Sequence, residues 1–397
     1  MFEYRHQPLG TLFILYTIAW TLARIPYWIL TSFSPSRRGR PTWSITRVLT
    51  IRILRTFIGV CFATSLPNSY EPEKGEKTKE KTGFVWVDPI PKEKGSVVVG
   101  EIGEMARVNG VEPVRVSGYW YGRRGVGGEV GQQAGAEEKV MIHFHGGGYV
   151  MSSGAPSDTT TPPICNGFLE HFSTINRVFA LEYRIASAKP FGPANPFPAP
   201  VLDALAGYVY LIHTVGFRPE NIIVSGDSAG GHITVALTRH LIHNKIEGIP
   251  PPSNILLLSP SLEWLFTHTG PQSSVERNKD VDYCALFYQG YVAQAIVGNL
   301  PENWIRTNPW IGPASLDIED STGWYTGFPR TCISAGDAEM QLDSIGTFRA
   351  RLIRDIGEEK VTYIETVGGT HDFVGLNFHE PERTEALEMI ASWIEGC

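Results

Sequence analysis

The sequence is poor in cysteine and shows no sign of a zinc site or a disulfide framework. Its five cysteines are scattered, odd in number and without Cys-x-x-Cys spacing. The chain also has no Asn-x-Ser/Thr sequon for N-glycosylation. If the protein is bound to a membrane, this absence favours the cytosolic side of that membrane for its main domain. We therefore expect buried thiols and no metal or organic cofactor; the cysteines are Cys61, Cys165, Cys284, Cys332 and Cys397.

Basic residues are too few overall for a nucleic-acid-binding protein. The formal net charge of −7 argues against nucleic acid as a partner, because binding to its phosphate backbone requires a basic face. The 397 residues suffice for one large catalytic domain with accessory segments. The arginines are unevenly placed, however, and six of them crowd one N-terminal stretch: Arg37, Arg38, Arg40, Arg47, Arg52 and Arg55.

No uninterrupted apolar run is long enough to span a membrane by itself. Leu9–Ala23 has 15 residues, whereas a helix needs roughly 20 to cross the hydrocarbon core. Arg24 and Pro26 interrupt the run before residues 27–30 continue it. We interpret this segment as membrane-associated; the alternative is an apolar helix that lies across the domain as a lid.

Two further segments separate this run from the main domain. Residues 41–65 mix arginines with apolar residues, which predicts a basic amphipathic helix that lies on a membrane or packs on the domain. Residues 67–82 are charged and contain proline and glycine, which is typical of a solvated linker. We therefore divide the chain into residues 1–66, a linker at 67–82 and a catalytic domain at 83–397.

Short apolar runs alternate with helical patterns through the catalytic domain. This order predicts a mostly parallel eight-stranded sheet covered by helices on both faces. The long aromatic stretch 262–327 breaks the rhythm and predicts a helical cap, and Asn109-Gly110 predicts a turn between the first two strands. The strands are expected at Phe84–Val87, Val114–Tyr121, Val140–His145, Val178–Tyr183, Ile222–Ser225, Ile255–Leu258, Thr331–Ser334 and Val361–Thr366, and the main helices at Val201–Val215, Gly230–His243, Ser344–Ile356 and Pro381–Ile394.

A serine stands between the fifth predicted strand and a helix, in the sequence Gly226-Asp227-Ser228-Ala229-Gly230. The G-x-S-x-G pattern in this context is typical of a nucleophile elbow, in which glycines allow a sharp turn that raises the serine. The following helix N-terminus stabilises developing negative charge. Ser228 is the predicted nucleophile.

A glycine run follows the third predicted strand, in His145-Gly146-Gly147-Gly148. Successive glycines let backbone N–H groups approach a substrate oxygen. We predict an oxyanion hole made by the N–H groups of Gly147, Gly148 and Ala229.

The remaining members of a triad should follow the seventh and eighth strands, because the expected order is serine, acid, histidine. Only His371 and His379 lie late enough, and His371 has the glycine-rich loop that brings it over the serine. Three carboxylates follow the seventh strand, Asp337, Glu339 and Asp343. Either residue type can orient the imidazole, so the pattern alone leaves the acid open.

Together these motifs make the sequence similar to the hormone-sensitive-lipase-like α/β-hydrolase family. The similarity extends from about Val114 to the C-terminus and includes HGGGY, residues 182–186, GDSAGG and THDF. The family's acid often lies in a D-P-L-x-D segment; Glu339-Met-Gln-Leu-Asp343 has the same frame, which implies Glu339. The N-terminal half resembles the fungal arylacetamide deacetylase and steryl acetyl hydrolase branch, which implies the endoplasmic reticulum membrane with the catalytic domain in the lumen. The arginines that follow the apolar run favour the cytosolic side instead, so the side stays open. Some members of the family act in secondary metabolism.

The resemblance and the motifs predict a serine esterase or deacetylase for a small-to-medium hydrophobic ester. An amidase or formamidase would use the same residues, and a lyase or acyl-transferring enzyme is a further alternative because fold does not fix function. A receptor-like binding protein on this scaffold can dispense with the histidine, so the presence of His371 disfavours it.

Overall fold

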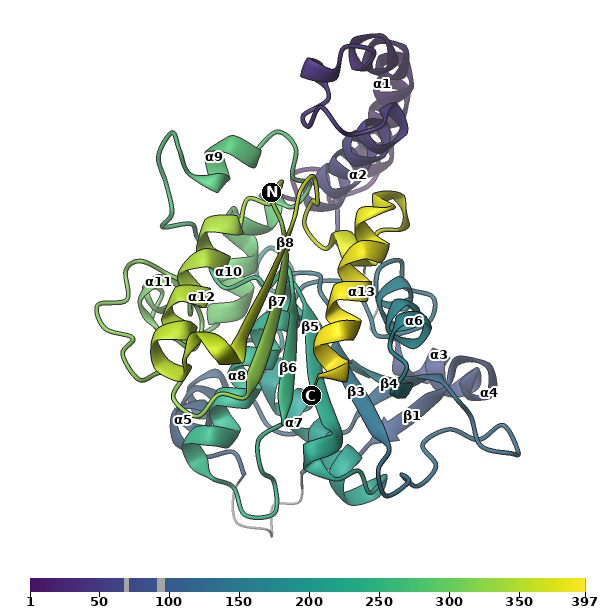
Figure 1. The fold of residues 1–397 in the computed structure, drawn as a ribbon. Helices are drawn as coiled ribbons and strands as arrows, with labels where there is room; N and C mark the ends of the chain where they lie inside the picture. The colour runs from purple at the N-terminus through teal and green to yellow at the C-terminus, as the bar shows by residue number, and fades with distance from the viewer. Residues whose placement is uncertain (68–70, 91–96, 397) are drawn as a thin grey trace.

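One eight-stranded sheet forms the centre of the molecule (Figure 1). The computed structural model describes residues 1–67, 71–90 and 97–396. The strand order is β1-β2-β4-β3-β5-β6-β7-β8, and only β1–β2 and β2–β4 pair antiparallel. This confirms the predicted mostly parallel sheet; its strands are β1 (Phe84–Val87), β2 (Val116–Gly122), β3 (Lys139–Phe144), β4 (Ile175–Glu182), β5 (Ile222–Asp227), β6 (Asn254–Leu258), β7 (Arg330–Gly336) and β8 (Val361–Thr366).

Helices cover both faces of the sheet, and alternate residues of each strand pack against opposite layers. In β3, Val140 and Ile142 belong to one apolar core and Met141 to the other. The first core contains residues of α5 (Gly100–Asn109), α7 (Ala199–Val209), α8 (Ala229–Asn244) and α12 (Leu342–Ile356). The second contains residues of α6 (Thr161–His171) and α13 (Glu382–Glu395). Burial on both sides explains the nearly continuous apolar sequence of the central strands.

The turn predicted at Asn109-Gly110 is present, but the sequence did not predict the helix that precedes it between the first two strands. Residues 100–109 form α5, and Gly110 ends it in the left-handed conformation at φ 62°. Asn109-Gly110 is therefore a helix C-terminus, where glycine is common for the same conformational reason as in a turn.

The aromatic stretch 262–327 consists of short helices joined by loops. It contains α9 (Ser274–Asn278), a 3₁₀ turn at Ala285–Tyr288, α10 (Tyr291–Val297) and α11 (Trp304–Thr307). Most of its large aromatic side chains are buried, including Trp264, Tyr288 and Trp310. These side chains join the same apolar core as Val140 and Ile142 of the sheet, which holds this irregular segment on the domain.

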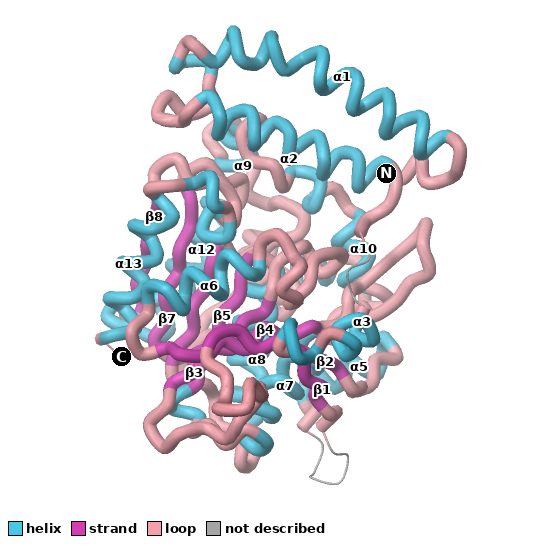
Figure 2. The backbone as a smooth tube through the Cα atoms, turned by 90° about the vertical axis from the view of Figure 1, so that its right-hand side faces the viewer, coloured by secondary structure: helices cyan, strands magenta, loops and turns pink. Residues whose placement is uncertain are grey.

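Two long helices lie together at one end of the molecule, with α1 (Leu9–Ser32) outside α2 (Ile45–Ala63) (Figure 2). Trp43 and Val48 are buried against the catalytic domain, and Arg47 forms a bidentate ion pair with Glu382 at 2.6 and 2.7 Å. By contrast, only Gly10, Trp28 and Ser32 of α1 are buried. Within the described residues α1 is the one helix long and apolar enough to cross a membrane by length and composition.

The segment expected to be a solvated linker is partly folded. It contains α3 (Pro72–Lys77) and α4 (Lys79–Thr82); residues 68–70 of the predicted linker lie outside the described residues. A Cβ at Gly75 would lie 2.5 Å from the Phe84 ring and 2.6 Å from the Tyr119 hydroxyl. Glycine thus allows α3 to pack directly on β1 and β2, a tertiary contact that the charged composition did not predict.

Four of the five cysteines are buried, as expected, and no disulfide joins any of these four. Cys397 lies outside the described residues.

Candidate active site

Ser228 occupies a strained turn between β5 and α8. Its φ of 49° and ψ of −115° are unusual for a residue with a side chain, and such strain is concentrated at functional sites. The flanking glycines are required by space, since a Cβ at Gly226 would lie 2.1 Å from the carbonyl oxygen of Gly230. At Gly230 a Cβ would lie 1.8 Å from the Phe144 carbonyl oxygen. The turn therefore holds the serine hydroxyl above the carboxyl ends of the central strands.

The structure brings Ser228, His371 and Glu339 into one hydrogen-bonded chain. Ser228 Oγ lies 2.8 Å from His371 Nε2, and His371 Nδ1 lies 3.0 Å from Glu339 Oε2. An ionised carboxylate can only accept, so Nδ1 donates to Glu339 and Nε2 is left to accept the serine proton. All three side chains are buried.

The second carboxylate oxygen of Glu339 is also fixed. Oε1 accepts hydrogen bonds from Ser259 Oγ at 2.7 Å and from the Gly336 amide at 2.6 Å. Burial raises the pKa of Glu339, while the hydrogen bonds from His371 and from these two donors oppose that shift by stabilising the carboxylate. Glu339 is held in one orientation towards the imidazole.

The two other candidate acids make contacts away from His371. Asp337 Oδ1 accepts from the Gly368 amide at 2.8 Å and faces Arg40 Nε at 3.5 Å. Asp343 Oδ2 accepts from the Ser274 amide at 2.7 Å. The loop after β7 thus turns only the middle carboxylate of the three towards the histidine.

Gly147 and Gly148 border the same cavity as Ser228, after β3. Both have positive φ, 95° and 60°, and a Cβ at Gly147 would lie 2.2 Å from the Met151 carbonyl oxygen. Ala229 is the first residue of α8, so its N–H has no acceptor within the helix. The predicted oxyanion-hole residues therefore lie around Ser228. At the two glycines no side chain stands between the backbone and the cavity.

Tyr183 fixes the loop that carries these glycines. Its hydroxyl donates to the carbonyl oxygens of His145 at 2.7 Å and Gly146 at 3.1 Å. The His145 ring stacks on the Tyr183 ring with centroids 4.0 Å apart. This gives a physical role to the segment after β4 that the sequence marked only by resemblance.

A cavity of about 780 Å³ opens above Ser228 and His371. Its walls are mostly apolar, with Ile53, Leu54, Phe57 and Ile58 contributed by α2 and Cys284, Phe287 and Tyr288 by the stretch 262–327. No residue of α1 is among the described residues that line it. Of the two N-terminal helices, α2 and not α1 therefore borders the cavity, because α2 lies between α1 and the domain (Figure 2).

Sequence reasoning missed Asp372, the neighbour of the histidine. Its Oδ2 lies 3.4 Å from His371 Nε2, and its backbone φ is 51°. Burial raises the pKa of Asp372. Burial lowers the pKa of His371, but Asp372, Cys284 and Tyr288 together more than offset this, and the pKa is raised overall. The only sequence signal was its position directly after the histidine.

A second missed residue is Ser261, which contacts the predicted nucleophile Ser228. Ser261 Oγ lies 2.9 Å from Ser228 Oγ and 3.0 Å from the Tyr288 hydroxyl, and it accepts from Gln341 Nε2 at 2.7 Å. Ser261, Tyr288 and Gln341 lie in three separate segments of the chain, so no local sequence motif indicates that they meet.

Comparison with known proteins places this site in a family. A profile of the alpha/beta hydrolase fold matches residues 141–375 of the chain. An esterase of Acinetobacter venetianus is 25% identical over 283 residues, which cover 71% of this chain and 81% of that protein. Steryl acetyl hydrolase 1 of Saccharomyces cerevisiae is 22% identical over 176 residues, covering 44% of this chain and 38% of that protein.

Solved structures agree with the fold. A hormone-sensitive lipase homologue from a metagenome library has a TM-score of 0.57 at 22% identity, covering 87% of this chain and 97% of that one. An esterase from the bacterial hormone-sensitive lipase family gives 0.57 at 20% identity, covering 89% and 99%. The chain belongs to the α/β-hydrolase family as a carboxylester hydrolase, and it shares its fold with solved hormone-sensitive-lipase-like esterases.

Proposed function

We propose that this protein hydrolyses a small-to-medium hydrophobic ester, with Ser228 as nucleophile, His371 as general base and Glu339 as the orienting acid. The observation that carries the proposal is the hydrogen-bonded chain of these three residues at the base of an apolar cavity. Carbonyl attack also needs donors for the oxyanion, and the N–H groups of Gly147, Gly148 and Ala229 are suited to that role.

In the first half-reaction, the Ser228 hydroxyl attacks the ester carbonyl while His371 Nε2 accepts its proton. Glu339 keeps the other imidazole proton on Nδ1 and stabilises the imidazolium. The tetrahedral intermediate then collapses, and His371 returns the proton to the leaving alcohol. Water repeats the sequence on the acyl-enzyme and releases the acid, so both steps use the same groups.

The cavity supports the substrate class. A volume of about 780 Å³ lies within the range of small-molecule sites, which are mostly apolar with a few polar groups at one end. Here the polar end is the reacting centre, and the walls from α2 and the stretch 262–327 suit an aliphatic or polycyclic group. The likeness to a steryl acetyl hydrolase supports a lipophilic alcohol with a short acyl group.

We further propose that α1 attaches the enzyme to a membrane. The support is the combination of an apolar helix of 24 residues with side chains that are largely exposed, including Leu12, Leu22 and Leu30. A lipophilic substrate would be most concentrated in the same membrane.

A series of p-nitrophenyl esters of increasing acyl length tests the esterase proposal. We expect hydrolysis to be fastest for short acyl chains and to be abolished by a fluorophosphonate that labels the nucleophile. The p-nitroanilide of the preferred acyl group is the matched control, because it differs from the p-nitrophenyl ester only in the leaving atom, nitrogen in place of oxygen. Faster cleavage of the anilide than of the ester would make the protein an amidase, and no turnover of either would contradict hydrolysis of simple acyl groups.

A further inference from the structure

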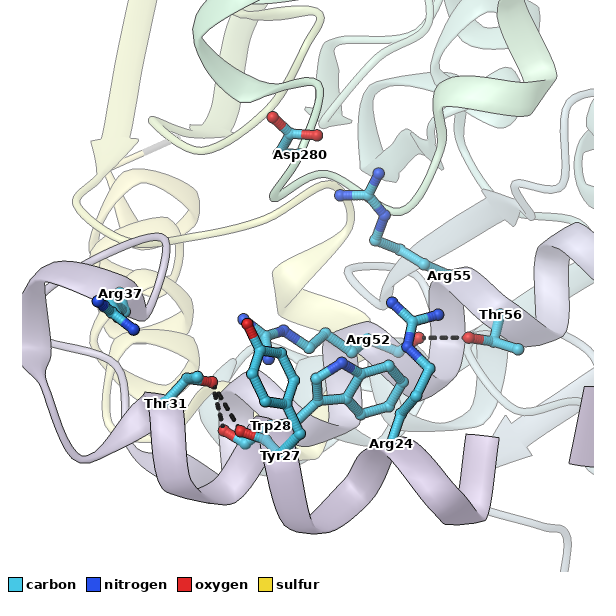
Figure 3. Close-up of a pocket in the computed structure, with 9 residues that line it drawn as sticks. All are labelled: Arg24, Tyr27, Trp28, Thr31, Arg37, Arg52, Arg55, Thr56 and Asp280. Atoms are coloured by element: carbon cyan, nitrogen blue, oxygen red, sulfur yellow. Dashed lines mark hydrogen bonds between the residues drawn. The ribbon is translucent and has the colours of Figure 1, made fainter. Parts of the chain in front are cut away.

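A second cavity, of about 670 Å³, lies between α1, α2 and the loop at Asp280 (Figure 3). We call it the arginine pocket, because four arginines line it: Arg24 on α1, Arg37 after α1, and Arg52 and Arg55 on α2. The side chains of Arg24, Arg52 and Arg55 extend into the space between the helices and the loop. One exposed carboxylate, Asp280, is the only acidic residue on its wall in the described chain.

Three of these four arginines lack the hydrogen-bonded partners that Arg177 and Arg184 have in the catalytic domain, whereas Arg55 donates to the Lys279 carbonyl oxygen at 3.0 Å. Within the described residues, the side chains of Arg24, Arg37 and Arg52 form no hydrogen bond or ion pair; Arg24 and Arg52 instead face the Trp28 ring at 5.0 and 5.6 Å. Burial and the neighbouring charges of Arg24 and Arg55 lower the pKa of Arg52. Positive charges held together in this way repel each other, and an anion between them would remove the repulsion.

The charge is concentrated in this region although the whole protein is acidic. Residues 1–66 contain eight arginines, no lysine and one glutamate, a formal charge of +7, so the other 331 residues carry −14. Beside the pocket, α1 exposes large apolar side chains to solvent, among them Leu15, Ile18, Trp20 and Leu22. An apolar surface adjoining a basic pocket matches the acyl and headgroup layers of an anionic membrane.

We propose that the arginine pocket binds the phosphate of an anionic phospholipid headgroup while the exposed apolar residues of α1 enter the acyl layer. Guanidinium groups suit phosphate oxygens because their planar donors can bind two of them at once. The lipid is favoured over a soluble phosphate because the exposed apolar helix is continuous with the pocket. The inference rests on the membrane association proposed above and adds the ligand and its residues.

Helix α2 links this pocket to the active-site cavity. Arg52, Arg55 and Thr56 line the arginine pocket, whereas Ile53, Leu54, Phe57 and Ile58 line the cavity above Ser228. A headgroup bound on one side of α2 would therefore place the apolar cavity on its other side close to the membrane surface. This position would allow a lipophilic ester to enter without crossing water.

Sedimentation of the full chain with vesicles tests the inference. The vesicles contain phosphatidylcholine alone or with phosphatidic acid, and the variant is the double substitution Arg24→Gln/Arg52→Gln. The matched control is Arg107→Gln/Lys245→Gln, which removes the same charge from exposed positions outside the pocket. At about 1 kcal/mol per basic residue near the surface, we expect the pocket variant to bind anionic vesicles roughly 30-fold more weakly and the control to bind like wild type. Melting temperatures check that both variants fold.

Each other outcome contradicts a different part of the proposal. Equal anionic-vesicle binding by wild type and the pocket variant would overturn the role of the arginines but leave membrane association intact. If wild type binds neither vesicle, the membrane association itself is wrong. If glycerol phosphate inhibits binding to anionic vesicles at concentrations that match the lipid phosphate, the ligand of the pocket is a soluble phosphate instead. Hydrolysis of a p-nitrophenyl ester in solution is measured separately, so failure of the esterase proposal is distinguishable from these results.

Discussion

The catalytic domain buries its apolar residues, whereas the outer N-terminal helix exposes them. Val140, Val224 and Leu256 of the central strands are fully buried, but Leu12, Leu22 and Leu30 of α1 are 58%, 61% and 69% exposed. Burial of such residues is the main source of folding free energy. The apolar residues of the strands therefore stabilise the fold, and those of α1 are available to a different apolar environment.

The same contrast holds for arginine. In the catalytic domain Arg177 pairs with Glu138 at 2.9 Å and Arg184 pairs with Asp203 at 2.8 Å. Arg24 and Arg52 have no such partner among the described residues. Arg24 is exposed and Arg52 is half-buried, so water can solvate both, whereas Arg177 and Arg184 are held by carboxylates within the fold. The difference separates arginines that hold the fold together from arginines that are free to meet the ligand proposed above.

Helix α2 and the segment that leads into it belong to the catalytic domain in their contacts, although they precede it in sequence. Trp43 Nε1 donates to the Gly368 carbonyl oxygen at 2.8 Å, close to the loop of His371. Arg40 donates to the Asp337 carbonyl oxygen at 3.1 Å, in the loop of Glu339. The N-terminal region thus divides into α1, which is largely exposed, and α2, which packs on the catalytic domain beside the candidate active site.

The largest expected effect is at the nucleophile. Ser228→Ala should lower kcat by roughly 10⁶, as loss of the triad serine does in a comparable hydrolase, and should abolish fluorophosphonate labelling. Ser261→Ala is the matched control, because this hydroxyl contacts Ser228 without reaching His371; it should keep the label. Labelling of the Ser228→Ala protein would mean that another serine attacks.

The next largest effect is expected at the acid. Glu339→Gln should lower kcat by roughly 10⁴, because an amide no longer fixes the imidazole tautomer. Asp337→Asn and Asp343→Asn should remain far closer to wild type in the same steady-state assay. A larger loss for Asp337→Asn than for Glu339→Gln would reverse the assignment.

A matched pair of tryptophans tests the difference between α1, which carries Trp20, and the segment leading into α2, which carries Trp43. Trp43→Ala should cost about 3–5 kcal/mol of unfolding free energy, because it leaves a cavity and removes a hydrogen bond to the domain. Trp20→Ala, at an exposed position on α1, should change stability by less than about 0.5 kcal/mol. Thermal and denaturant unfolding measure both, and equal destabilisation would show that α1 is a structural element of the fold.

The smallest expected change is a displaced pH profile for Asp372→Asn. The Asp372 carboxylate raises the pKa of His371 by stabilising the imidazolium, so its removal should lower that pKa. Only neutral His371 can accept the serine proton, and the acid limb of kcat/KM should therefore move to lower pH. An unchanged profile would mean that Asp372 does not act on the histidine, whose other neighbours include Glu339, Cys284 and Tyr288.

Much of the sheet could be predicted because its signals are local. Ile222–Ser225 and the GDSAG turn that follows show apolar continuity and glycine spacing within about ten residues, and the structure differs there by two residues at the strand end. His371 was found by its place in the chain order, which the fold imposes. Glu339 could be preferred only through a resemblance, since Asp337 and Asp343 are chemically equivalent in sequence.

The tertiary structure decided what depends on distant segments. The contact of Ser261 with Ser228, the direction in which Asp337 turns and the docking of Trp43 on the loop before His371 all join residues more than thirty positions apart. The sequence by itself predicted the eight strands and marked Ser228 and His371 as candidate catalytic residues, because backbone turns and burial patterns are properties of short segments. Which carboxylate meets the histidine, which helix covers the cavity and which arginines remain without partners depended on packing, because these are properties of surfaces that exist only after the chain has folded.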